Sequence, residues 1–139
     1  MNEVDIFIKL CRDDFAFYAK QALKIIEPET DFEWNFHLDA VCKTLEELED
    51  DKRREVDFNI PPRMLKTLII TVIFPTWVWI KKPHTKFLST SSSYDLANKL
   101  NIKRRELIES DFYQKLFPIK IKDYRNTIGV FENVFNGFM

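Results

Sequence analysis

Apolar residues recur at helical spacing in three segments of the chain. The first covers residues 15–26 and ends before Pro28; the second begins at about His37 and carries one apolar stripe through Leu48. The third covers residues 94–110. Apolar positions three and four residues apart line one face of an α-helix, so we expect three amphipathic helices here.

Short continuous apolar runs lie between these segments. Residues 56–60 and 86–90 read as strands, and the first is closed by Pro61 and Pro62. In residues 68–80 nearly every position is apolar, and periodicity cannot separate a buried strand from a buried helix. The β-branched residues there favour a strand, and Pro75 disfavours a helix. Alternating strands and helices predict an α/β fold with a parallel sheet.

The last residues of the chain are apolar and contain a turn signal. Asn136–Gly137 is typical of a β-hairpin turn, so we expect a hairpin whose second strand is missing. The alternative is a C-terminal strand that docks on the sheet. We divide the chain into an N-terminal helical segment, residues 1–55, and a core that begins at residue 56 and continues to 139.

Composition limits the class of protein. Of 139 residues, 45% are hydrophobic and 31% charged, which fits one globular domain and neither a disordered nor a membrane protein. The run 68–80 is shorter than the ~20 apolar residues of a membrane span. Cys11 and Cys42 occupy apolar helix positions, so we expect buried structural thiols. The acidic N-terminus lacks the basic region of a signal peptide, which predicts a cytoplasmic protein.

Charge is divided unevenly along the chain. Residues 1–60 hold 8 Lys and Arg against 16 Asp and Glu, a net −8; residues 61–139 hold 13 against 6, a net +7. We therefore expect contacts with phosphate groups in residues 61–139. The alternative is that the positive charge of this half is ordinary surface charge. Lys103, Arg104 and Arg105 either face DNA or a neighbouring subunit's nucleotide, or form a solvated basic face.

Residues 61–67, Pro-Pro-Arg-Met-Leu-Lys-Thr, are the main candidate for chemistry. A phosphate loop needs converging backbone N–H groups, a lysine for the β/γ-phosphates and a hydroxyl for Mg²⁺. Lys66 and Thr67 supply the last two. The generic pattern would place glycines at positions 60 and 65, where this chain has Ile60 and Leu65.

An ordered set of motifs over residues 32–139 resembles the large subunit of phage terminases, the ATP-driven motors that package DNA. One group of these proteins has the loop Pro-Pro-Arg, two variable residues, then Lys-Ser/Thr, and Met or Leu can replace the glycine before the lysine. The other matching pieces, in chain order, are Trp34-Asn35-Phe36-His37-Leu38-Asp39-Ala40-Val41, Phe74-Pro75-Thr76-Trp77, Lys86-Phe87-Leu88 with Ser91-Ser92-Ser93-Tyr94, Arg105-Glu106-Leu107-Ile108-Glu109-Ser110 and Phe112-Tyr113-Gln114.

The resemblance implies a partial P-loop NTPase-type parallel sheet with N-terminal helices, lacking the later strands. It implies that the run from Thr67 is the helix after the loop, and that ATP and Mg²⁺ are the ligands. The implied nucleotide-binding residues are Pro62, Arg63, Met64, Leu65, Lys66 and Thr67. Thr67 would hold the Mg²⁺ and Arg63 would reach the γ-phosphate, although a salt bridge from Arg63 to the acidic half of the chain stays open. Phe36 and His37 would contact adenine, although a structural role for His37 stays open.

In the intact family the implied partners are double-stranded DNA, the terminase small subunit and the portal protein, in the cytoplasm of a bacterial host and with self-association into an oligomer. No apolar strand ending in an acidic pair follows Lys66 in these residues, and the acidic nuclease cluster is absent. We therefore expect a truncated terminase ATPase segment from a prophage remnant, which at best binds nucleotide weakly without efficient hydrolysis and at worst is inert. The alternatives are a non-catalytic α/β interaction module and, less favoured, a membrane-surface protein using Trp77 and Trp79.

Overall fold

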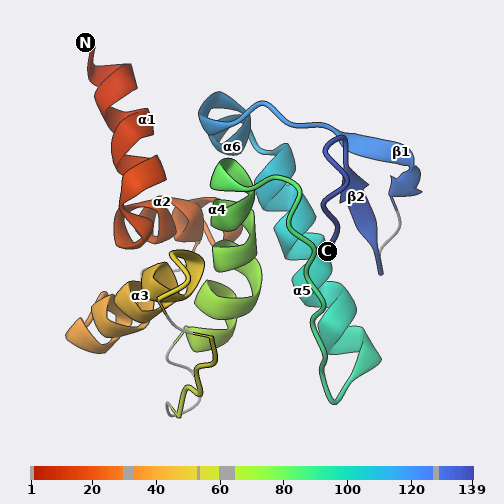
Figure 1. The fold of residues 1–139 in the computed structure, drawn as a ribbon, viewed down its shortest axis with the longest axis horizontal. Coiled ribbons are helices and arrows are strands. Elements are labelled where there is room, and N and C mark those ends of the chain that lie inside the picture. Colours follow the sequence, from red (N-terminus) through yellow and green to blue (C-terminus); the bar gives the residue numbers. More distant parts are fainter. Residues whose placement is uncertain (1, 30–32, 53, 60–64, 127–128) are drawn as a thin grey trace.

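Helices dominate the protein, as the computed structural model in Figure 1 shows. The structure describes residues 2–29, 33–52, 54–59, 65–126 and 129–139, and the side chains of all of these except 123–126. The elements are α1 (Glu3–Asp13), α2 (Phe15–Ile26), α3 (Phe36–Glu49), the π-helical segment η1 (Leu68–Ile73), α4 (Phe74–Lys81), α5 (Tyr94–Glu109), α6 (Asp111–Leu116), β1 (Ile121–Asn126) and β2 (Phe131–Asn133).

Segment η1 and helix α4 form one continuous helix at the centre of the molecule. Every residue from Val72 to Ile80 is buried. Helices α1, α2 and α5 all contact this central helix, with α1 and α2 on one side of it and α5 on the other (Figure 1). A helix covered on all faces can be apolar all round, which explains why its sequence has no polar stripe.

The predicted strand at residues 68–80 is therefore wrong, and the helix implied by the terminase resemblance is confirmed. β-branched residues favour strands only weakly, and burial against neighbouring helices overrides that preference. Pro75 is the second residue of α4, so the N–H that it lacks would have bonded to a carbonyl of η1 and not to one of α4.

The predicted parallel sheet is also wrong. Within the described residues the only sheet is the antiparallel pair β1 and β2, with Ile121 opposite Asn133. Residues 56–59 and 86–90, predicted as strands, have no regular structure, and Ile60 lies outside the described residues. The segment 86–90 has a single backbone hydrogen bond toward the C-terminal residues, from Phe87 N to Phe138 O at 2.8 Å. Since the central helix fills the core, residues 56–59 and 86–90 run over the surface of the protein.

The predicted turn at Asn136–Gly137 is confirmed. The last residues fold back on β2, with Asn133 N donating to Gly137 O at 2.8 Å and Met139 N donating to Phe131 O at 3.0 Å. Asn136 adopts a left-handed φ of 67°, a conformation that Asn tolerates well. The C-terminal residues therefore pack against β2, as the docked-strand alternative expected, and the prediction of a hairpin whose second strand is missing is wrong.

The predicted amphipathic helices correspond to α2, α3 and α5. Their stripes form the core together with the central helix, and Cys11 and Cys42 are both buried, as expected. Asn2, Asp14 and Ser93 cap the starts of α1, α2 and α5 by accepting hydrogen bonds from backbone N–H groups. The charged run after α3 is exposed at residues 50–52 and 54–55, whereas Glu49 is buried beside Lys81 and Lys82.

Candidate functional site

The predicted phosphate loop is described only at its C-terminal end. Pro62, Arg63 and Met64 lie outside the described residues. Leu65 has φ 64°, in the left-handed region, at the position where the generic pattern has glycine. A side chain in this conformation costs roughly 1–2 kcal/mol. The backbone that a glycine would provide is thus present although the residue is leucine.

Lys66 and Thr67 form the first residues of the central helix. Leu65 O accepts from Ile69 N at 3.1 Å, so the helical hydrogen bonds begin at Leu65. Lys66 is half-buried and Thr67 is exposed. The first N–H groups of a helix have no partner inside it, and the helix dipole favours an anion there. Backbone donors, an ammonium group and a hydroxyl therefore lie within three consecutive residues.

Phe36 and His37 begin helix α3. The Phe36 side chain is 85% exposed, and its ring meets the His37 ring edge to face with centroids 5.9 Å apart. Helix α3 packs on α2. An exposed aromatic ring is suited to stacking on a base, but that these two residues share a nucleotide with Lys66 stays a prediction.

The three side chains of the basic triplet of α5, residues 103–105, do not form one solvated face. Lys103 pairs with Glu27. Arg104 is 3% exposed, and the Arg105 guanidinium lies over the Phe131 ring, 5.4 Å from its centroid. The predicted solvated basic face is therefore wrong, because these side chains pack against the protein, whereas a contact with DNA or with a neighbouring subunit's nucleotide stays a prediction.

Arg104 explains how the central helix accommodates Pro75. In an α-helix the Thr71 carbonyl would accept from the N–H of residue 75, and proline has none. Arg104 Nε donates to Thr71 O at 2.6 Å instead. The π-helical bond from Phe74 N to Ile69 O lies beside it. The sequence carried no local sign of this contact, which joins α5 to the central helix.

A second polar cluster lies deeper in the core, around Thr76. The Tyr113 hydroxyl donates to Thr76 O at 2.7 Å, and the Tyr18 hydroxyl lies 2.8 Å from Thr76 Oγ1. Burial raises the pKa of both tyrosines well above 10. These groups are fully enclosed, so they bind the helices together and do not form a site for a ligand.

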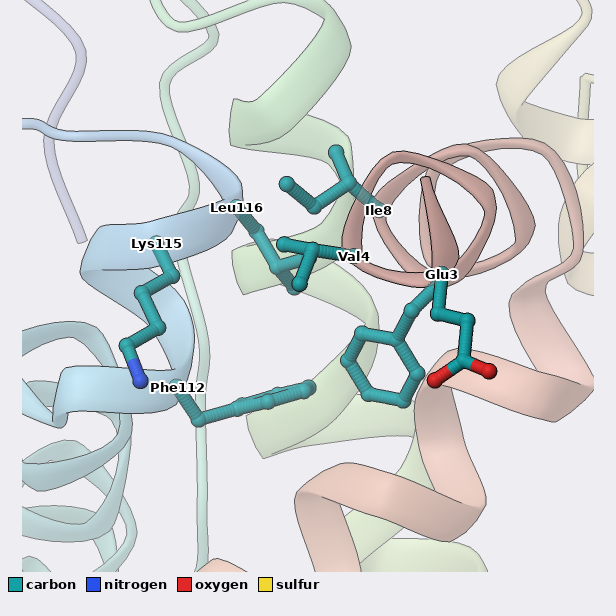
Figure 2. Close-up of a pocket in the computed structure, with 7 residues that line it drawn as sticks. Glu3, Val4, Ile8, Phe112, Lys115 and Leu116 are labelled. Carbon is teal, nitrogen blue, oxygen red and sulfur yellow. The ribbon is translucent and has the colours of Figure 1, made fainter. Parts of the chain in front are cut away.

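An apolar groove separates α1 from α6, and sequence reasoning missed it. Its volume is about 420 Å³, and Figure 2 shows Val4, Ile8, Phe112 and Leu116 lining it. The Glu3 carboxylate and the Lys115 amine lie on opposite walls (Figure 2). No sequence signal could have located the groove, because α1 and α6 are a hundred residues apart in the chain.

The described residues contain no cluster of three or more His, Cys, Asp or Glu side chains that could hold a metal ion. None of the helices in the described part of the chain combines the length and the apolar character that crossing a membrane requires.

Comparison of the chain with protein-family models, with curated proteins and with solved structures found no match.

Proposed function

We propose that this chain carries the nucleotide-binding part of a terminase-type DNA-packaging ATPase. The observation that carries the proposal is the start of the central helix at Leu65, Lys66 and Thr67. Local propensity favoured a strand in the run that follows, whereas the terminase resemblance required a helix, and a helix is what forms. The left-handed φ of Leu65 adds support, since it stands where glycine occurs in generic phosphate loops.

The proposed roles follow from the chemistry of each side chain. Lys66 neutralises charge on the β- and γ-phosphates, and the Thr67 hydroxyl is a ligand of Mg²⁺. Backbone N–H groups at the helix start bind phosphate oxygens. By the resemblance, Arg63 reaches the γ-phosphate, and Phe36 and His37 contact adenine.

The proposed activity is binding of Mg-ATP without efficient hydrolysis by these residues alone. Hydrolysis in this class needs an acidic pair at the end of an apolar strand, and the sequence of residues 68–139 has no apolar run that ends in two acidic residues. Double-stranded DNA, the small subunit and the portal protein are proposed partners of the complete motor. Self-association is proposed on the same basis.

The test is a calorimetric titration of Mg-ATP into the wild-type chain, the Lys66→Ala variant and the Lys99→Ala variant. Lys99 is an exposed cation on α5 and serves as the matched control. Loss of one charge-assisted hydrogen bond, about 1.5–3 kcal/mol, weakens affinity about tenfold to a hundredfold. We expect that loss for Lys66→Ala and none for Lys99→Ala. Equal affinity of all three proteins for Mg-ATP would refute the proposal.

A second candidate function is an interaction module, and the groove between α1 and α6 favours it. Its apolar floor and the opposite charges of Glu3 and Lys115 fit an amphipathic helix of a partner, with a carboxylate near Lys115 and a cation near Glu3. Val4 is 60% exposed in the groove.

A synthetic amphipathic peptide with leucines along one face and flanking Glu and Lys residues tests this candidate. We expect binding to the wild-type chain and loss of binding in Val4→Asp. Leu88→Asp is the control, because Leu88 is 90% exposed and lies outside the groove. Binding that persists in Val4→Asp, or a scrambled peptide that binds equally, would exclude the groove.

A further inference from the structure

A cavity lies between helix α5, the segment that contains Ser89 and the C-terminal residues that follow β2. Its volume is about 190 Å³. Phe87, Val130 and Phe138 contribute apolar walls, and Arg104 and Asn101, each 3% exposed, supply buried polar groups. Among the residues whose side chains the structure describes, no Asp or Glu lines the cavity.

Arg104 brings a positive charge to this cavity. Its Nε donates to Thr71 O, its Nη1 to Asn101 Oδ1 at 3.2 Å and its Nη2 to Ser89 Oγ at 2.5 Å. All three acceptors are neutral oxygens, and no carboxylate of the described residues forms an ion pair with Arg104. Burial lowers the pKa of the Arg104 guanidinium from 12.5 to about 10. A buried charge without a counter-ion is costly, so an anion placed beside it would be stabilised.

The guanidinium retains donors for such an anion. Arginine has five N–H bonds, and the three hydrogen bonds above use one on each nitrogen. Each terminal nitrogen therefore keeps a second N–H. Asn98 carries an amide and Tyr94 a hydroxyl, and both residues line the same cavity. The cavity is smaller than the roughly 300 Å³ at which sites for drug-sized ligands begin, so its size suits a small group.

We propose that this cavity binds a small oxyanion, a phosphate or carboxylate group, whose oxygens accept hydrogen bonds from the terminal nitrogens of Arg104. The planar guanidinium matches the two oxygens of either group. The apolar walls beside Arg104 lower the local polarity and so strengthen the contact. This site is separate from Lys66 and does not depend on the nucleotide proposal.

The experiment titrates inorganic phosphate, and separately acetate, into the chain carrying Lys66→Ala, so that the proposed nucleotide site does not contribute. The readouts are the side-chain NMR resonances of Arg104 in ¹⁵N-labelled protein and the thermal melting temperature. Sodium chloride at equal ionic strength is the control for screening. We expect saturable shifts of the Arg104 resonances and a rise in melting temperature with phosphate, with acetate, or with both.

Variants show whether the cavity is the site. Ala97→Phe fills the cavity from α5 and leaves the three hydrogen bonds of Arg104 in place, so we expect the oxyanion affinity to fall about tenfold or more. Lys99→Ala on the same helix keeps the affinity. Arg104→Lys keeps a charge but loses the forked donors, and it should weaken binding to a similar extent. The proposal is overturned if neither anion exceeds chloride, or if Ala97→Phe binds as well as its parent. Binding by phosphate alone identifies a phosphoryl ligand, and binding by acetate also identifies a carboxylate.

Discussion

Gly137 is the residue at which a single methyl group should do most harm to the fold. A Cβ added there would lie 2.2 Å from Pro83 O and 2.8 Å from Thr85 O, both backbone atoms. Contacts of a Cβ atom essentially never fall below 3.0 Å. The C-terminal segment and residues 83–85 must therefore move apart by about 0.8 Å, the difference between 3.0 and 2.2 Å.

That separation disturbs the hydrogen bonds that hold the C-terminal turn. Asn133 Nδ2 donates to Pro83 O at 2.6 Å, and Asn133 N donates to Gly137 O at 2.8 Å. Losing two hydrogen bonds costs about 1–3 kcal/mol. Overpacking adds about 1–3 kcal/mol. Gly137→Ala should therefore lower the free energy of unfolding by about 2–6 kcal/mol, which corresponds to a fall in melting temperature of roughly 6 °C or more.

The chain offers a matched control in its other glycine. A Cβ at Gly129 would meet only Asn98 Oδ1, at 4.0 Å, which is an ordinary contact. Gly129→Ala should change the free energy of unfolding by less than about 1 kcal/mol. Urea denaturation of both variants is the assay. If Gly137→Ala unfolds at the same urea concentration as Gly129→Ala, the docking of residues 137–139 against residues 83–85 is refuted.

Three further predictions concern the core. Thr76→Val leaves the buried Tyr18 hydroxyl without its 2.8 Å contact and should lower the free energy of unfolding, measured by urea denaturation, by about 1–3 kcal/mol. The control is Thr44→Val on the surface of α3, which should lower it by less than about 1 kcal/mol. Equal losses of stability in the two variants would contradict the role of Thr76. Burial raises the pKa of Cys11 from 9.0 to about 11 and that of Cys42 from 9.0 to about 12, so unfolding releases protons above pH 9. Stability should be independent of these thiols below pH 9 and fall between pH 9 and about 12, and a Cys11→Ala, Cys42→Ala double variant should show a smaller fall. Both thiols should react with a disulfide reagent only on unfolding, and fast reaction of the native protein would contradict their burial.

The helices that carry amphipathic stripes could be predicted from the sequence. Residues 94–110 were predicted and α5 covers Tyr94–Glu109, because Ser93 caps its start and Ser110 ends it. The central helix could not be predicted locally. A helix buried on all faces and a buried strand both read as continuous apolar sequence, so packing decides between them. The sheet prediction was wrong for this reason, since it took that run as one of its strands.

Among the candidate sites, too, local motifs could be found in the sequence, whereas features that depend on packing between distant segments could not. Lys66 and Thr67 are candidates because a phosphate loop is a local motif, and their binding of a nucleotide stays a prediction. The basic triplet was misread because consecutive helical residues point about 100° apart, so Lys103, Arg104 and Arg105 cannot share one face. The cavity beside Arg104 and the groove between α1 and α6 depend on contacts between distant segments, which the sequence pattern does not encode.

The most direct test of the central claim is hydrogen–deuterium exchange, read by mass spectrometry, with and without Mg-ATP. The account predicts slower exchange in peptides that cover the start of the central helix, residues 65–69, and loss of that protection in Lys66→Ala. Unchanged exchange there at saturating Mg-ATP, or protection confined to α1 and α6, would contradict nucleotide binding at Lys66 and Thr67.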